Sequence, residues 1–523
     1  MAISVESTVQ PEVAGAYARL EEKILERDQR ASSEIFYDLV RAGRPLPELL
    51  GEIVRIHAPY THVPYHQRLD DGIVRFVNND HCLLSSRASM DLMKMIRPEL
   101  AYLPLAQTIW YLPTGLDPWN QLLGKMPGHY VRLYELKFEG KPPLPEVHWP
   151  DQEPLVIPGT FPEKLNAWLT LVQRGEVVNA YRVFLGLWDE ALADSPRRTQ
   201  LLAHLVFAGL IDVQDRMLHN RSYTTGHKSY RARATVQLAQ AVGWHNARSI
   251  LYAGVPDMAV GPRWHSTYEM GCLVVQNFLG GRDQDFLDND GALTSVESLA
   301  LIEAILSGEE PAYIDLIVAL VKAGKGLRQI IDTIQVASAQ VILETGEPNN
   351  FSMAQHSYEY CNNVRWFFDT FQHPHRLKLL FVAAAFVTRA SHHQRHTPDN
   401  GADKIATPKG ADTMSPEQML GQLDEALLAL RAGEAVNWTA AYLKAGHDRR
   451  ALVEELATAA AKMGNDPHNQ ELGVCLLEDY AHSTAEDRDR LLLASAKHTA
   501  GHRKYGDPLE AYRRFAEAFD LAT

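Results

Sequence analysis

Apolar residues recur at the i, i+3, i+4 and i+7 positions along most of this chain, the spacing that predicts helices packed by one face. Alternation of apolar and polar residues, which would indicate a strand, never extends beyond a few residues. Proline, glycine and polar residues interrupt the helical pattern at 128–162 and at 391–416. We therefore predict an all-α protein with an irregular, β-like insertion at 128–162 that has room for one hairpin, and a flexible linker at 391–416.

The helical segments resemble one another in order and content. Four stretches, near 31–57 and from Arg174, Ser307 and Arg431, share a helix, a short turn and a second helix. In three of them an Ala-Gly pair closes the first helix, where glycine takes the left-handed conformation of a C-terminal cap. These pairs are Ala42-Gly43, Ala323-Gly324 and Ala445-Gly446, and the second stretch has Ala193-Asp194 instead.

A histidine opens the expected third helix of every copy, and an arginine leads into the fourth helix of three copies. The histidines are His81, His227, His356 and His468, and the arginines are Arg248, Arg376 and Arg488. We therefore expect one domain, 1–523, of four degenerate modules with about 16 helices in a toroid or solenoid-like bundle. The module boundaries are approximately 20–127, 165–290, 298–392 and 417–515.

Composition narrows the range of partners. The net charge is −14 and no run of five basic residues occurs, which argues against nucleic acid and anionic membranes as partners. The first residues lack the pattern of a secretory signal, and the longest apolar segment is too short for a membrane span, so a cytoplasmic location is expected. The four cysteines show no CxxC spacing and are expected to be free. A small-molecule partner fits best, and the oligomeric state stays open.

The four histidines in register are the strongest candidates for chemistry. Equivalent positions in a closed ring of modules face a common axis, so His81, His227, His356 and His468 could converge on one ion. Neutral imidazole binds iron, zinc, copper and nickel, and an all-nitrogen shell with a vacant position suits redox-active iron. The alternative is that each histidine is an ordinary capping or turn residue.

Other residues are secondary candidates. A loop could bring His57, His62 and His66 together as alternative metal ligands. His265, His392 and His502 are expected to close the fourth helices, either as a second layer around the site or as ordinary helix-end residues. Trp110, Tyr230 and Tyr358 could line a substrate pocket, although aromatic residues at helical spacing usually belong to the core. No nucleophile elbow, phosphate loop, HExxH motif or dinucleotide-binding motif is present.

The third-helix segments FVNNDHCLLSSRASM, GHKSYRARATVQLAQAVG, MAQHSYEYCNNVRW and DPHNQELGVCLLEDY resemble those of the questin oxidase-like proteins. That family consists of helical enzymes that oxidatively open polyketide anthraquinone rings. The resemblance implies non-haem Fe(II) held by His81, His227, His356 and His468, with dioxygen as co-substrate. The family pattern can add a modified lysine as a fifth ligand, but here no lysine follows His468 within two helical turns. Glu471 lies one turn away and is expected to be an alternative ligand or a residue behind the ligands.

The leading hypothesis is therefore an iron-dependent oxygenase, an oxidoreductase acting on a small organic, aromatic or polyketide-like substrate. One alternative is a helical-repeat scaffold without catalysis, in which the histidines are turn residues. Another is a Zn-dependent hydrolase or lyase with the same four ligands, since the sequence does not separate iron from zinc.

Overall fold

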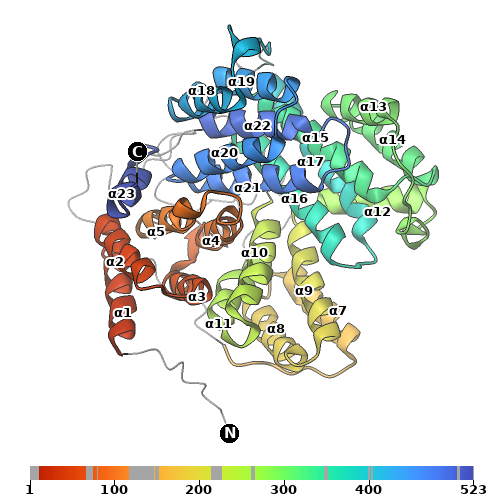
Figure 1. The fold of residues 1–523 in the computed structure, drawn as a ribbon. Helices are drawn as coiled ribbons and strands as arrows, with labels where there is room; N and C mark the ends of the chain where they lie inside the picture. The colour runs from red at the N-terminus through yellow and green to blue at the C-terminus, as the bar shows by residue number, and fades with distance from the viewer. Residues whose placement is uncertain are drawn as a thin grey trace.

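The computed structural model describes residues 11–65, 75–78, 81–116, 147, 152–213, 226–260, 265–346, 351–397, 401, 404–502 and 507–521. Within these residues the chain forms 22 α-helices, several short 3-10 turns and one two-stranded hairpin (Figure 1). The predicted all-α class is confirmed. No helix in the described part of the chain is long and apolar enough to span a membrane.

The helices follow one another in four groups along the chain. The first group is α1 (Pro11–Leu25), α2 (Gln29–Arg41), α3 (Leu46–His57), α4 (Cys82–Leu92) and α5 (Leu103–Gly115). The second is α7 (Phe161–Arg174), α8 (Val177–Ala191), α9 (Ser195–Leu210), α10 (His227–Val242) and α11 (Arg248–Gly254), followed by α12 (Ser266–Phe278). The third is α13 (Ser295–Leu306), α14 (Glu310–Lys322), α15 (Leu327–Leu343), α16 (Phe351–Thr370) and α17 (Arg376–Arg395). The fourth is α18 (Pro416–Leu428), α19 (Ala432–Lys444), α20 (Arg449–Lys462), α21 (Pro467–His482) and α22 (Asp489–Gly501), followed by α23 (Glu510–Ala518).

The predicted glycine turns are present. Gly43, Gly324 and Gly446 follow α2, α14 and α19 with φ values of 68°, 78° and 74°. These left-handed conformations end each helix and let the chain reverse into the next one. In the second group Asp194 replaces the glycine, and its side chain caps α9 by accepting a hydrogen bond from the Arg197 N–H.

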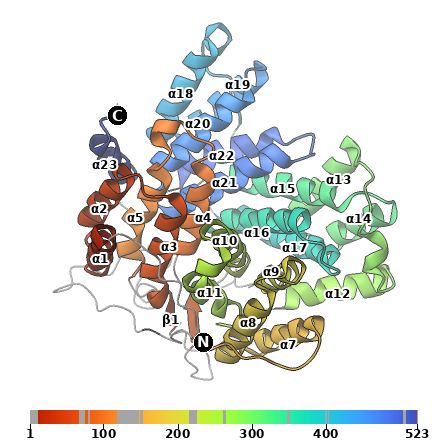
Figure 2. The same cartoon turned by 60° about the horizontal axis from the view of Figure 1, so that its bottom comes forward.

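Four helices form the centre of the molecule. α4 packs against α10 and α21, and α16 also packs against α10 and α21, so the four helices make a closed cycle (Figure 2). We call α4, α10, α16 and α21 the inner helices. Each of them also packs against the helix that follows it, which is α5, α11, α17 or α22. The cycle therefore brings together segments from all four groups.

The last helix closes the chain onto the first group. α23 packs against α5, and its Phe515 and Phe519 rings meet the Tyr37 ring edge-on at 5.9 and 5.7 Å between centroids. Arg41 donates a hydrogen bond to the Ala518 carbonyl. Figures 1 and 2 both show α23 beside α2, far from α12 and α14.

Several expectations need correction. The helices number 22 in the described residues rather than about 16, because each group begins with an additional helix (α1, α7, α13 or α18) and α12 and α23 stand outside the groups. The one described hairpin pairs β1 (His62–Tyr65) with β2 (Arg75–Asn78) in antiparallel fashion, within the first group. Most of the insertion at 128–162, where a hairpin was expected, lies outside the described residues.

The predicted linker at 391–416 begins with ordered helix. α17 continues to Arg395 because two polar side chains in its last turns are satisfied inside the protein. Ser391 donates to the Leu306 carbonyl at 3.2 Å, and Gln394 Nε2 donates to Thr345 Oγ1 at 2.7 Å. Because these hydrogen bonds offset the cost of burying polar groups, α17 extends beyond the segment in which apolar residues recur at helical spacing. All four cysteines are free, as predicted.

Candidate metal centre

Each inner helix contributes one of the four predicted histidines near its N-terminal end. His81 is the N-cap residue of α4, His227 is the first residue of α10 and His468 is the second residue of α21. His356 is the sixth residue of α16, so the expectation that it opens its helix is wrong. α16 begins one turn earlier than predicted because Phe351 packs into the core, 1% exposed.

The structure brings the four imidazole rings together. The ring centroids of His81 and His468, and those of His227 and His356, are 4.6 Å apart. The other two sides of this quadrilateral measure 5.4 Å from His81 to His227 and 5.8 Å from His356 to His468. One nitrogen each of His81, His227 and His468 lies within 4.8 Å of the others. A single ion could bind among these nitrogens after small side-chain adjustments, because metal–imidazole bonds are about 2 Å long.

Glu471 orients the His81 ring. The Nδ1 atom of His81 lies 3.1 and 3.0 Å from the two Glu471 carboxylate oxygens, and the Ser85 hydroxyl donates to Oε1 of the same carboxylate at 3.1 Å. A carboxylate at this place requires the proton of a neutral imidazole to be on Nδ1, which leaves the Nε2 lone pair able to bind a metal. Glu471 thus contacts a candidate ligand through both of its oxygens. A ligand role for its own oxygens stays a prediction.

Asp466 orients the His468 ring in the same way. His468 Nδ1 donates to Asp466 Oδ1 at 2.8 Å, and His502 Nε2 lies 2.9 Å from Asp466 Oδ2. Burial alone would raise the pKa of Asp466, but His502 and His468 together hold it well below its ordinary range. His502, the C-cap of α22, thus lies against Asp466, and with Asp466 and His468 it forms a second group whose possible ligand atoms lie within 4.8 Å of one another. Its role, behind the four histidines or as a helix-end residue, stays a prediction.

His227 has a different environment. Among the described residues neither of its ring nitrogens has a hydrogen-bond partner. Burial lowers its pKa well below the ordinary value, and the neighbouring His356, Arg231, His81 and His468 lower it further. The ring is therefore neutral near neutral pH, which is the form that binds metals. An imidazole without partners, facing three others, fits a metal-ligand role.

Aromatic residues border the histidines. The Tyr230 ring lies 5.4 Å from the His227 ring and 6.4 Å from the His356 ring, nearly parallel to the latter at 11°. The Tyr111 ring meets His81 edge-on at 6.2 Å. The other two proposed pocket residues are placed differently. Trp110 is buried in α5, where Arg514 lies over its ring, and Tyr358 is buried near Asp479, which together with burial raises its pKa. Of the three, Tyr230 is the one placed beside the centre.

The remaining candidate histidines do not join the described metal-ligand groups. His57 is fully buried at the end of α3, and His392 is exposed in the last turn of α17, where its ring packs against His396 at 4.2 Å. His265 does not close a fourth helix as expected, because α11 ends at Gly254 and His265 is the N-cap of α12. The His62 backbone pairs in β1 while its side chain lies outside the description, and His66 lies outside the described residues.

Sequence reasoning missed several residues near the centre. Asp466 stands two residues before His468, at the N-cap of α21. An aspartate at this position is explained by capping alone, so the sequence did not indicate its contact with His468. Ser85 carries no motif. Glu359 lies three residues after His356, as Glu471 does after His468, and this shared spacing was a usable signal.

Comparisons of the chain with known protein families, with curated proteins and with solved structures gave no match. The resemblance to the questin oxidase-like proteins therefore stays a prediction carried by the residues of the inner helices.

Proposed function

We propose that this protein is a metal-dependent oxygenase whose centre is held by His81, His227, His356 and His468. The observation that carries the proposal is the quadrilateral of imidazole rings, with sides of 4.6 to 5.8 Å, contributed by four segments far apart in the sequence. Ordinary turn residues have no reason to meet in this way. His81, for example, is an N-cap residue whose side chain makes no capping hydrogen bond.

The electrostatics of the cluster also favour a metal. Four imidazoles in a shared interior cannot all be protonated, and burial already lowers the pKa of His227. Crowded neutral imidazoles gain little from one another, whereas a cation can accept one nitrogen lone pair from each. The carboxylates of Glu471 and Asp466 support that role, since they hold the two rings they contact in a fixed tautomer and orientation.

The choice of iron and of dioxygen follows the resemblance stated above. A bound iron would supply the one-electron chemistry that dioxygen activation needs. The protein's own residues do the rest: the four histidines hold the ion, Glu471 and Asp466 orient two of them, and Tyr230 and Tyr111 border the space beside the rings. We propose a small organic substrate, aromatic or polyketide-like, as the reaction partner of dioxygen.

We further propose that the bundle is a closed ring of four quasi-equivalent modules. The closed cycle of α4, α10, α16 and α21 supports this interpretation, as does the packing of α23 onto the first group. In such a ring, duplicated positions face one axis, which accounts for a ligand from every module.

The test is elemental analysis by plasma mass spectrometry of protein purified without chelator. Wild type is compared with His227→Ala and His356→Ala, and with His392→Ala as the matched control, because His392 is exposed and outside the cluster. We expect near-stoichiometric iron in wild type and in the control, and loss of iron in folded forms of the other two variants.

Other outcomes are equally informative. Zinc in place of iron would favour a hydrolase or lyase at the same site. No bound metal, or metal retained by the His227 and His356 variants, would refute the four-histidine centre and favour a binding scaffold. If iron is present, oxygen consumption with aromatic substrates is the next measurement.

A further inference from the structure

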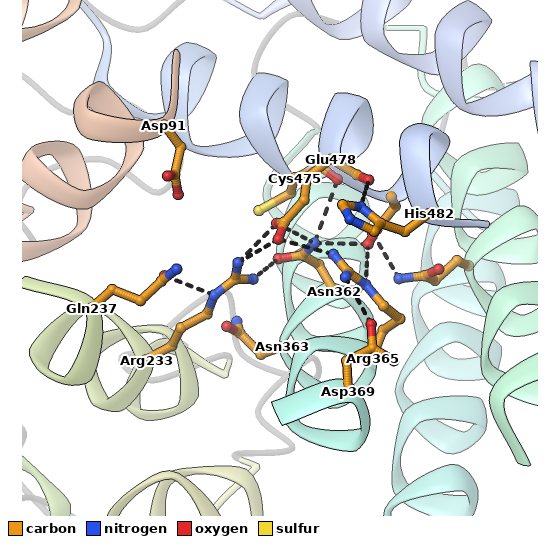
Figure 3. A network of polar contacts seen from close by, with 12 residues as sticks. Asp91, Arg233, Gln237, Asn362, Asn363, Arg365, Asp369, Cys475, Glu478 and His482 are labelled. Atoms are coloured by element: carbon orange, nitrogen blue, oxygen red, sulfur yellow. Dashed lines mark hydrogen bonds and ion pairs between the residues drawn. The ribbon is translucent and has the colours of Figure 1, made fainter. Parts of the chain in front are cut away.

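A buried network of charges joins the four inner helices away from the histidines. Figure 3 shows the part of it that connects α10, α16 and α21. Its centre is the Glu478 carboxylate of α21. Arg233 of α10 donates to both Glu478 oxygens at 2.7 and 2.9 Å, Arg87 of α4 donates at 3.2 Å, and Arg365 of α16 lies at 3.1 Å. One carboxylate therefore contacts guanidinium groups from the three other inner helices.

Asn362 completes the connection. Its Oδ1 accepts a hydrogen bond from Arg233 at 2.6 Å, and its Nδ2 donates to Glu478 at 3.2 Å and to Asp479 at 2.9 Å. Asp479 also accepts hydrogen bonds from Arg365 at 2.8 Å and from Gln335 of α15 at 2.7 Å. Figure 3 shows Arg233 of α10, Asn362 and Arg365 of α16 and Glu478 of α21 pointing toward one another.

Three members of the network stand at the same offset from the histidines. Arg87, Arg233 and Asn362 each lie six residues after the histidine of their own helix, and Glu478 lies ten residues after His468. Six residues of α-helix correspond to about 9 Å along the helix axis. The network is thus a second layer of cross-connections between the same helices, more than one turn further along them.

The charged groups of the network are largely buried, so their relative positions are tightly constrained. The side chains of Arg233, Arg365 and Arg87 are 1%, 3% and 8% exposed, and that of Glu478 is 17% exposed. Burial would raise the pKa of Glu478, but Arg233, Arg87 and Arg365 hold it well below its ordinary range. A buried ion pair adds little net stability compared with apolar packing, yet a broken one is costly, so such networks select a single arrangement of the elements they join.

We propose that Glu478 is a positioning residue of the metal centre: by binding Arg87, Arg233 and Arg365, it sets the register of the four inner helices and so the geometry of the four histidines. The inference rests on the proposed function, because it concerns the same centre. Glu478 touches none of the reacting atoms in this scheme and acts through the helices that carry the ligands.

The experiment uses Co²⁺ as a probe in full-length protein stripped of metal. Its visible absorption reports the number and symmetry of the ligands, and its dissociation constant is measured by competition with a chelator. Glu478→Gln keeps the side-chain shape but removes the charge, while Glu478→Asp keeps the charge on a shorter side chain. Ile317→Ala is the stability control, since this fully buried residue of α14 lies on no inner helix.

We expect Glu478→Gln to weaken Co²⁺ binding by about tenfold, the lower end of the effect of removing an outer-shell partner. Its absorption spectrum should change in shape, and Glu478→Asp should restore part of both properties. Ile317→Ala should lose stability without changing affinity or spectrum. Arg233→Gln, which removes one arm of the network, gives the same test if Glu478→Gln does not fold.

The inference is overturned if folded Glu478→Gln, or Arg233→Gln in its place, binds Co²⁺ with the affinity and spectrum of wild type. It is also overturned if Ile317→Ala changes both properties to the same extent, since the effect would then be one of general stability. Wild type that binds no Co²⁺ at all would refute the proposed centre itself, which is a distinguishable result.

Discussion

Asp466→Asn tests how far the centre depends on residues behind its ligands. Asp466 is buried, 4% exposed, and its two oxygens face His468 Nδ1 at 2.8 Å and His502 Nε2 at 2.9 Å. Asparagine has the same shape, but it offers one acceptor and one donor in place of two acceptors. One of the two histidines must therefore lose its favourable contact or change its tautomer.

The size of the effect follows from this exchange. Removing an outer-shell partner of a metal-bound histidine typically weakens metal affinity by about 10- to 100-fold, which is about 1.4 to 2.7 kcal/mol. A buried group left without its partner also costs about 1 to 3 kcal/mol of folding stability. We therefore expect a folded, less stable variant with clearly weaker metal binding.

The assay combines Co²⁺ competition titration with denaturant unfolding of the metal-free protein. Asp332→Asn is the matched control, because Asp332 is equally buried but bonds Arg328 and Thr484 rather than histidine. The control should lose stability and keep its affinity for Co²⁺. If Asp466→Asn binds Co²⁺ as tightly as wild type does, the carboxylate does not orient His468 and the reasoning fails.

Three further predictions concern stability. Burial and the neighbouring Asp424 raise the pKa of Glu455 from 4.5 to about 7, so its contribution to stability is full below about pH 4.5 and is lost as pH rises through about 7. Glu455→Gln should remove a decline of about 3 kcal/mol in the free energy of unfolding across this window, measured by urea unfolding, and an unchanged decline would refute this. Burial lowers the pKa of His373 from 6.5 to about 3, so the folded protein loses at most about 5 kcal/mol of stability as pH falls from about 6.5 to about 3. His373→Phe should shift the midpoint of acid unfolding to lower pH, and an identical midpoint would count against the idea. A Cβ atom on Gly209 of α9 would lie 2.6 Å from the Lys228 carbonyl of α10. Gly209→Ala should therefore lower the free energy of unfolding by about 1 to 3 kcal/mol and, by shifting the neighbouring His227, weaken Co²⁺ binding. An unchanged free energy of unfolding would show that the two helices can separate.

Local rules made much of the fold predictable from the sequence. The helical period indicated the class, and the Ala-Gly pairs indicated where three helices end, because few residues other than glycine adopt φ values near 70°. The arginines expected before the fourth helices stand there, as the first residues of α11 and α17 and as the N-cap of α22. These signals depend on residues close together in the chain.

Contacts between distant segments were beyond prediction. Glu471 meets His81 across 390 positions, and Asn362 meets Glu478 across 116. Nothing in the local pattern distinguishes these polar residues from solvent-facing ones on amphipathic helices. His265 shows the converse error, since an offset from an arginine predicted a helix end where the chain in fact continues through a 3-10 turn into α12.

The positions that do not repeat carry the chemical asymmetry of the centre. Three residues after the four histidines stand Leu84, Tyr230, Glu359 and Glu471. Burial raises the pKa of Tyr230, and Glu359 and Glu471 raise it further, so these three groups lie close enough to influence one another. Both carboxylates come from α16 and α21, which pack together, whereas α4 and α10 present leucine and tyrosine. An ion held by the four histidines would therefore have a nearly symmetric nitrogen shell with unlike groups around it, so a ligand on the ion would meet different residues in different orientations.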